Sequence, residues 1–274
     1  MTFAQGICGA ALLASAAAAS AASPSNSNPA DRTSGIGPVS ASVRLEYTDF
    51  SKLYGDRTIL TADSRLGAGR STRVHVGLST GVRRVPGVTI HGMQVRGAVT
   101  HDWSDRLTTH SYGGLASNGS IFAKSEIGQD FSYELGGGFV VKAGGKYANY
   151  GNHTDVTTWS AGATYYARGA TFSYRFSLID SNRFGRSNAH LASVRVKDGR
   201  GGGFTQLWLG HGSSLYEADL PRSPAGKFTS LAVKRSQPIG GGFSVDVGAN
   251  QAWYRTPNGN YRGTGAVAGL SFSK

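Results

Sequence analysis

The sequence predicts an all-β protein, a transmembrane antiparallel up-and-down β-barrel of about fourteen strands, with roughly 12 to 16 strands possible. Three observations lead to this fold class. Apolar and polar residues alternate with a period of two over most of the chain. Glycine is abundant, with 40 residues in 274, whereas only 16% of the residues are charged. Tight and longer connections also alternate along the chain, as they do in outer-membrane barrels.

The same composition excludes several other classes of protein. Helical membrane proteins need repeated runs of about 20 apolar residues, and this sequence has none. A hydrophobic content of 39% and an aromatic content of 10% are too high for a disordered basic tail. Lys and Arg outnumber Asp and Glu by 28 to 16, but the charges are dispersed and no recognition motif accompanies them. We therefore expect no nucleic-acid partner.

The chain begins with an expected targeting segment. Residues 1–22 are expected to be a signal peptide, because Ile7–Ala22 is uncharged, Ala-rich and too short to span a bilayer, and small residues end it. No Lys or Arg precedes this run, and an Ala-rich cytosolic linker is the alternative. Residues 23–38 are expected to be a flexible lead-in, and 39–274 the barrel. The predicted location is the bacterial outer membrane, reached by export through the periplasm.

The expected strands follow from the alternation and from the turn residues between them. In the clearest strand, 170–181, Phe172 and Tyr174 point to one face and Ser173 points to the other. The predicted strands are 39–50, 57–67, 71–83, 88–102, 106–117, 121–133, 138–149, 155–167, 170–181, 188–198, 203–213, 227–236, 242–254 and 260–273.

The connections between these strands alternate in size. One set is tight, as at 136–137, and the other is mostly longer, as at 51–56 and 214–226, although the connections near 84–87 and 118–119 are short. Short periplasmic turns opposite longer outer loops are typical of a transmembrane barrel. A soluble β-sandwich or propeller is the competing fold, but its apolar faces would carry bulkier Leu and Ile residues than these strands do.

Aromatic residues near the predicted strand ends are expected to form interfacial girdles. They are Tyr47, Phe50, Trp103, Tyr147, Tyr150, Trp159, Tyr254 and Tyr261. The last strand ends its apolar face with Phe272, and a terminal aromatic of this kind is what barrel-assembly machinery reads, so that machinery is an expected partner during insertion.

Outer-membrane lipids and lipopolysaccharide are the other expected partners. Basic residues in the predicted loops are placed to bind lipopolysaccharide phosphates or simply to be solvated. They are Lys52, Arg57, Arg183, Arg186, Arg222, Arg255 and Arg262.

The polar faces of the strands carry the remaining charges. Because a charge that faces hydrocarbon near the midplane costs about 2–4 kcal/mol, these faces are expected to line the lumen. The inward residues are Arg44, Glu46, Asp63, Arg65, Arg73, Arg83, Arg96, Lys124, Glu126, Asp130, Lys142, Lys146, Arg175, Arg195, Lys197 and Asp246. The residues expected to shape an anion-favouring field are Arg73, Arg96, Lys142, Lys146, Arg175, Arg195 and Lys197.

Two interpretations of these charges stay open. A basic, water-filled lumen would bind or pass small anionic or glycan solutes. Alternatively, internal ion pairs would plug the barrel and leave it a structural or envelope-assembly protein. In that lattice, Lys142 and Lys146 of one strand would face Glu126 and Asp130 of the strand before it.

Catalysis is a remote alternative. His211 and Ser213 share a strand face, which makes them weak candidates for a serine hydrolase, but such a site also needs a third group that orients the ring. The chain is otherwise expected not to be an enzyme. The His residues show no metal-ligand spacing, and the only cysteine, Cys8, lies in the expected signal peptide, so no metal or other cofactor is expected.

Three stretches of the sequence also resemble a known family. Residues 137–178, GGFVVKAGGKYANYGNHTDVTTWSAGATYYARGATFSYRFSL, are similar to the YaiO-type outer-membrane β-barrel proteins, as are LWLGHGSSLYE at 207–217 and VSASVRLEYTDFSKLYGDRTIL at 39–60. The resemblance covers most of 39–274. It implies an outer-membrane barrel, linked in some members with envelope or exopolysaccharide functions, and it supplies no catalytic residues.

Overall fold

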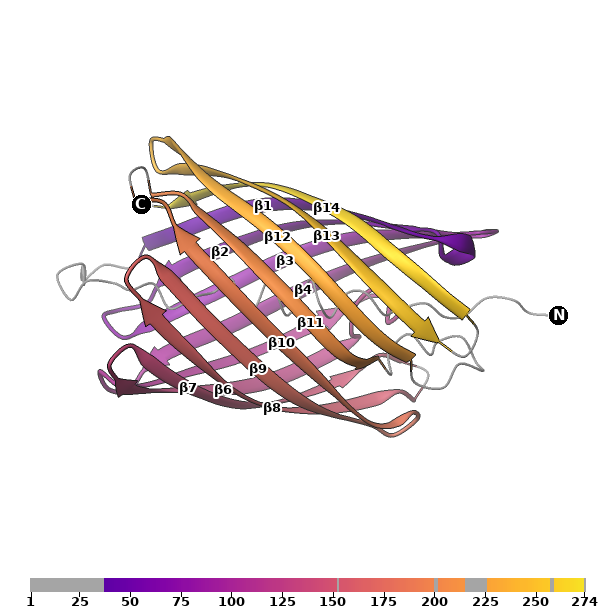
Figure 1. The fold of residues 1–274 in the computed structure, drawn as a ribbon, viewed down its shortest axis with the longest axis horizontal. Helices are drawn as coiled ribbons and strands as arrows, with labels where there is room; N and C mark the ends of the chain where they lie inside the picture. Colours follow the sequence, from indigo (N-terminus) through magenta and orange to yellow (C-terminus); the bar gives the residue numbers. More distant parts are fainter. Residues whose placement is uncertain (1–36, 152, 200–201, 215–225, 257–258, 274) are drawn as a thin grey trace.

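The protein is described by a computed structural model that covers residues 37–151, 153–199, 202–214, 226–256 and 259–273. These residues form one closed barrel of fourteen antiparallel strands (Figure 1). Each strand pairs with its neighbours in sequence, and β1 pairs with β14. The predicted fold class is therefore confirmed. The expected signal peptide and residues 23–36 of the lead-in lie outside the described residues. No helix within the described ranges is long and apolar enough to cross a membrane.

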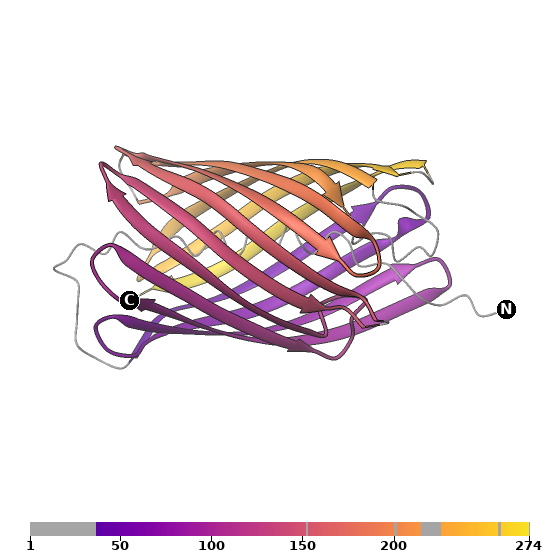
Figure 2. The ribbon, with the colours of Figure 1, turned by 90° about the horizontal axis from the view of Figure 1, so that it is seen from below.

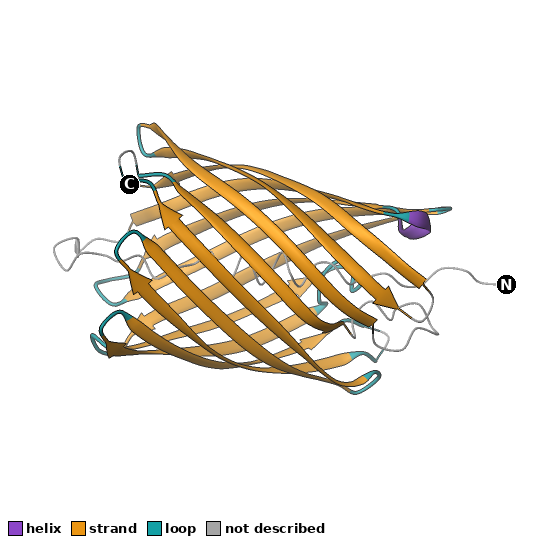
Figure 3. Ribbon diagram, in the orientation of Figure 1, coloured by secondary structure: helices purple, strands orange, loops and turns teal. Residues whose placement is uncertain are grey.

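The strands are long, and a single short 3-10 helix interrupts their succession in the described chain (Figure 3). The elements are β1 (Gly37–Phe50), η2 (Lys52–Tyr54), β2 (Asp56–Gly67), β3 (Thr72–Val85), β4 (Val88–Asp102), β5 (Leu107–Ala116), β6 (Ser125–Gly136), β7 (Phe139–Asn149), β8 (Asp155–Ala167), β9 (Ala170–Ser181), β10 (Gly185–Lys197), β11 (Phe204–Ser214), β12 (Gly226–Gly240), β13 (Phe243–Thr256) and β14 (Gly259–Ser273).

Most predicted strand ends lie within three residues of the observed ones. The strand predicted at 121–133 is wrong at its start, because β6 begins only at Ser125 and residues 117–124 form a connection. The connection near 118–119 is therefore longer than predicted. β12 also continues past the predicted residue 236 to Gly240, with a register shift between Pro238 and Gly240.

The two ends of the barrel differ in their connections (Figure 2). The terminal end holds Gly37 and Ser273, and most of its connections are tight turns. In two of these turns, at 136–138 and 240–242, three consecutive glycines have positive φ values, a conformation that other residues rarely adopt. The opposite end, termed the loop end, carries the connections β1–β2, β5–β6 and β7–β8. Short turns are typical of the periplasmic side of a membrane barrel.

Side chains alternate between the outer surface and the lumen in register around the wall. Val43 of β1, for example, pairs with Ala62 of β2 and Leu270 of β14 on the outer surface. Large apolar side chains on this surface, including Leu45, Leu178 and many others, are exposed. In a folded chain this exposure would be unfavourable in water, and it is what a membrane-spanning barrel presents to lipid.

The predicted girdle is correct in part. Four of its residues have exposed side chains, namely Tyr47, Trp103, Tyr147 and Trp159.

Three other predicted girdle residues, Phe50, Tyr254 and Tyr261, are instead buried inside the barrel. The register gives the reason, since Tyr254 pairs with Tyr261 on the inward face, and Phe50 occupies an inward position of β1. Because side chains alternate, a shift of one position exchanges the lipid-facing side of a strand for the lumen.

Four predicted loop residues lie on strands instead, namely Arg57 on β2, Arg186 on β10, Arg255 on β13 and Arg262 on β14. The side chain of Arg57 faces the lumen and is only 4% exposed. It is therefore not accessible to lipopolysaccharide. Arg222 lies outside the described residues.

Candidate functional site in the barrel lumen

The lumen has two halves of different chemistry. The half nearest the terminal end, termed the basic half, has charged inward side chains that keep contact with solvent. Its basic residues are Arg44, Arg65, Arg73, Arg96, Lys142, Arg175, Arg195, Lys197 and Lys234. Its acidic residues are Glu46, Asp63, Asp102, Asp130, Glu134 and Asp246. The half nearest the loop end, termed the apolar half, instead contains two clusters of buried aliphatic and aromatic side chains, with the buried Arg57 and Arg83 beside them.

All seven residues predicted to shape the lumen field occupy inward positions of their strands. Four of them form ion pairs with carboxylates of other strands. The pairs are Arg73–Asp102 at 2.8 Å, Arg96–Asp63 at 3.5 Å, Lys146–Glu126 at 3.8 Å and Arg175–Asp130 at 3.6 Å.

The predicted lattice between β6 and β7 is therefore only half correct. Lys146 faces Glu126 as expected, but Asp130 pairs with Arg175 of β9 rather than with Lys142. The Asp130 carboxylate can extend across β7 toward β9 because its partner residue on β7 is Gly144. A Cβ on Gly144 would lie 1.8 Å from Asp130 Oδ1. The glycine leaves the space through which Asp130 crosses the strand.

The same device recurs along β2–β6. Asp63, Gly77, Arg96, Gly114 and Glu126 pair in one continuous row across five strands. A Cβ on Gly77 would lie 2.4 Å from Asp63 Oδ1, and a Cβ on Gly114 would lie 3.2 Å from Arg96 Cγ. Long charged side chains thus lie flat along the wall over glycines. This arrangement neutralises charge along the wall.

Neutralisation is incomplete in the basic half. Within the described part of the chain, Arg65 and Lys142 form no ion pair. Two histidines not singled out from the sequence also face the lumen here. His75 Nε2 lies 3.4 Å from Asp63 Oδ1, and the His110 ring is hydrogen-bonded to Thr100 Oγ1 at 2.9 Å. The wall therefore keeps a surplus of basic groups next to the terminal end.

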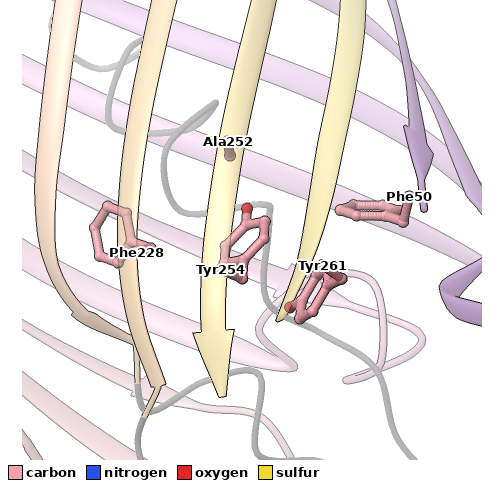
Figure 4. Packing of buried hydrophobic residues seen from close by; sticks show 5 residues of the cluster. All are labelled: Phe50, Phe228, Ala252, Tyr254 and Tyr261. Atoms are coloured by element: carbon pink, nitrogen blue, oxygen red, sulfur yellow. The ribbon is translucent and has the colours of Figure 1, made fainter. Parts of the chain in front are cut away.

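In the apolar half, an aromatic cluster lies on the inward faces of β1 and β12–β14 (Figure 4). It consists of Phe50, Phe228, Ala252, Tyr254 and Tyr261.

Stacking holds this aromatic cluster together. The Tyr261 ring stacks on Tyr254 at 4.5 Å and on Tyr54 of η2 at 4.1 Å. The Arg83 guanidinium lies 4.9 Å from the centre of the Phe50 ring and donates to the Tyr54 carbonyl at 3.3 Å. The β1–β2 connection is thereby fixed to the wall.

The β5–β6 connection, residues 117–124, closes the opposite side of the apolar half and is termed the inserted loop. Its Ile121 is only 1% exposed and packs with Phe122 and Ile59. Gly81 and Gly92, which pair directly on β3 and β4, make room for it, because a Cβ on Gly81 would lie 2.8 Å from Ile121 Cγ2. The loop therefore lies inside the barrel mouth.

Hydrogen bonds fix the inserted loop in place. Asn118 Nδ2 donates to the His91 carbonyl at 3.1 Å, and the Met93 amide donates to Ser117 Oγ at 2.9 Å. On its other side Gly119 lies against the Tyr150 carbonyl, where a Cβ would come within 1.8 Å. The loop thus extends from β4 to the β7–β8 connection.

Lys124 was predicted as an inward residue of a strand and is instead part of the inserted loop. Its aliphatic chain lies beside Gly151, where a Cβ would be 3.1 Å from Lys124 Cε. The prediction failed because β6 starts one residue later than Lys124.

The structure does not assemble a hydrolase site around His211 and Ser213. Both residues occupy outward positions of β11, and the His211 ring bonds to Thr229 Oγ1 at 3.1 Å rather than to a carboxylate of the described chain. No three His, Cys, Asp or Glu side chains of the described ranges are arranged to hold a metal ion.

Comparison with known proteins identifies the barrel. The family model of the YaiO membrane beta barrel domain matches residues 39–218, which is more than half of the chain. The chain belongs to the YaiO family. The match begins in β1 and extends past β11, and it confirms the resemblance seen in the sequence.

Three solved structures share the fold of this YaiO-family chain. A "CymD monoaromatic hydrocarbon channel" has a TM-score of 0.60 at 8% identity, with 88% of this chain and 89% of that chain covered. A "Bacterial polysaccharide outer membrane secretin" has a TM-score of 0.55 at 10% identity, with 85% and 98% covered. Pseudomonas aeruginosa OccD3 (OpdP) has a TM-score of 0.50 at 12% identity, with 93% and 97% covered. At such identities the likeness shows the fold alone, that of an outer-membrane β-barrel.

Proposed function

We propose that this YaiO-family barrel binds or passes small anionic or glycan solutes along the basic half of its lumen. The observation that carries the proposal is the surplus of inward basic groups, with Arg65 and Lys142 outside the ion-pair lattice of the described chain. Barrels of about 8 strands are filled by side chains, whereas those of about 16–18 leave an aqueous channel. A fourteen-stranded barrel approaches the second class. A basic wall in such a lumen concentrates anions.

The proposal includes the route and the surroundings of the barrel. The chain would be exported through the periplasm, inserted by barrel-assembly machinery that reads β14 with Phe272, and surrounded by outer-membrane lipid. Lipopolysaccharide phosphates would meet exposed basic residues of the loop end, such as Arg186. The chain would not be an enzyme, so Ser213→Ala should leave any esterase background of the preparation unchanged.

A second candidate function is a structural or envelope-assembly barrel with a closed lumen, possible also for an exopolysaccharide-associated protein. The observation that favours it is the apolar half, where the inserted loop and the aromatic cluster bury Ile121, Phe122 and Phe50 inside the mouth. In this function the ion pairs serve stability rather than passage.

Single-channel conductance of refolded protein in a planar bilayer separates the two functions. Under a salt gradient, the proposed function predicts steady openings with a reversal potential that favours anions. Folding is checked separately by heat-modifiable gel mobility. Silence from protein shown to be folded, or openings that favour cations, would contradict the proposal, and silence would support the closed structural barrel.

A further inference from the structure

A cavity lies inside the barrel next to the aromatic cluster, on the boundary between the two halves of the lumen. Its volume is about 120 Å³, and its lining includes Trp208, Asn250, Thr48, Arg57 and the ion-paired Arg44 and Glu46. A cavity of about 150 Å³ binds benzene, so this cavity is of the size that takes a single six-membered ring.

Trp208 is the unusual member of this lining. Trp103, Trp159 and Trp253 are exposed, whereas Trp208 points inward and is only 6% exposed. Its Nε1 donor has no hydrogen-bond partner in the described part of the chain. A buried donor without an acceptor is unfavourable, and buried Trp residues usually find a partner. A ligand that supplies an acceptor would remove this penalty.

The backbone register builds the cavity wall. Trp208, Ala232, Asn250, Gly265, Thr48 and Arg57 form one continuous row from β11 through β14 to β1 and β2. Small residues alternate with large ones along this row. A Cβ on Gly265 would lie 2.7 Å from Asn250 Nδ2, so the amide lies flat across the glycine. The row thus presents an indole, an amide, a hydroxyl and a guanidinium to one space.

These groups match the chemistry of a saccharide. An indole offers an apolar surface for the C–H face of a sugar ring and a polar N–H at its edge. Amide, hydroxyl and charged groups bind sugar hydroxyls, and a few such groups in an apolar pocket are typical of small-molecule sites. An aliphatic ligand would leave Trp208 Nε1 without an acceptor.

We propose that this cavity binds one sugar ring of a saccharide, with Trp208 as its stacking platform and Asn250 as a hydrogen-bonding partner. The proposal rests on the proposed function only in that the saccharide must reach the lumen. Lys234, which forms an ion pair with Asp246 at 3.1 Å, and Arg44 also line the cavity, and the basic wall around them favours a ring that carries a carboxylate.

The experiment is saturation-transfer NMR on the refolded full chain in detergent micelles, with trigalacturonate and maltotriose as the probes. Wild-type protein should transfer saturation to sugar ring protons, more strongly for trigalacturonate. Trp208→Leu should reduce this transfer at least fivefold, and Asn250→Ala should reduce it severalfold. Trp208→Phe, which keeps an aromatic platform, should retain part of it. The matched control is Trp253→Leu on the outer surface, which should transfer as the wild type does.

Each outcome decides the inference. Absence of transfer from folded wild-type protein to both saccharides, or full transfer in folded Trp208→Leu, would overturn the sugar site. If Trp208→Leu fails to fold, as gel mobility would show, Trp208→Phe and Asn250→Ala carry the test, and unchanged transfer in both would overturn it. Conductance measured on the same samples tests the proposed function independently. Anion-selective openings without saturation transfer to either saccharide would support the proposed channel function and overturn the sugar site.

Discussion

The basic and apolar halves of the lumen are built on the same fourteen strands and yet do opposite things with their inward side chains. In the basic half, charged side chains such as Asp63 and Arg96 lie along the wall over glycines. In the apolar half, the glycines Gly81 and Gly92 make room for Ile121, which the inserted loop places inside the barrel mouth. The comparison teaches that an inward glycine does not by itself predict an open lumen. Whether the lumen beside the glycine is open depends on which side chain of a neighbouring strand or loop lies over the glycine.

The largest effect on the difference between the two halves is expected when large side chains are removed from the apolar half. Ile121→Ala combined with Phe122→Ala removes the side chains that the inserted loop buries in the mouth, and single-channel conductance should rise severalfold. Leu115→Ala is the matched control, because Leu115 is exposed on the outer surface next to the same loop and its change should leave conductance as in the wild type. Equal conductance in the double variant and the control would mean that this loop does not obstruct the lumen.

Reversing charge in the basic half should change ion selectivity with little change in conductance. Lys142→Glu combined with Arg175→Glu replaces two inward cations with anions close to Asp130, so the anion-to-cation permeability ratio should fall severalfold and pass below one. The ratio is read from the reversal potential under a salt gradient. Arg106→Glu, in an exposed turn at the terminal end, should change it much less. If the double variant kept the permeability ratio of the wild type, the basic residues of the wall would not determine ion selectivity, and this would contradict the proposed function.

Filling one of the wall glycines should lower stability without closing the lumen. Gly144→Ala places a methyl group where Asp130 now crosses β7, and overpacking of this kind costs about 1–3 kcal/mol. The free energy of unfolding in urea should fall by that amount. Gly97→Ala is the control, since its added Cβ meets no atom within 4 Å. Equal stability of the two variants would show that Asp130 moves aside at no cost.

The smallest expected effect lies outside both halves, at the terminal-end turn that follows β10. Hydrogen bonds from the Arg235 guanidinium, one of them at 2.8 Å, lower the pKa of Asp198 below its ordinary value of 3.8. A lowered carboxyl pKa stabilises the fold above pH 3.8, and the contribution is lost as the pH falls through the folded-state pKa. Between pH 5 and pH 2, the Tm of the Asp198→Asn variant should therefore fall slightly less than the Tm of the wild type. A steeper loss in the variant would contradict this pairing.

The sequence predicted the strands well because a barrel imposes one physical demand on every strand. A charge on the lipid side is costly, so alternation of polar and apolar residues is enforced along the whole wall. That same demand placed Arg73, Arg175 and the other basic residues on the correct face. It also predicted that Lys146 would face Glu126, because the two residues are diagonal neighbours on adjacent strands, within reach of long side chains.

The inserted loop was missed for a related reason. Ile121, Ala123 and Ser125 continue the alternation of β6, so periodicity alone cannot show that the first of them leave the wall. The compensating signal is the pair Gly81 and Gly92, but these two residues become neighbours only when the register of β3 and β4 is known. Trp208 and Asn250 were missed likewise, since the row that joins them crosses three strands.

The pairing of β1 with β14 has a consequence for how the barrel forms. The amide of Arg262 donates to Ser51 Oγ at 3.0 Å across 211 positions of sequence, whereas every other seam joins strands that follow one another in the chain. The entropy of loop closure grows with the length of chain between two partners, and contacts of high sequence separation form slowly. Before this last pairing, β1 and β14 are both unprotected edges that can pair with other chains. The time to closure is therefore the interval in which the folding chain is most exposed to aggregation, and a β14 that pairs more slowly would lower the yield of folded barrel even if the finished barrel were equally stable.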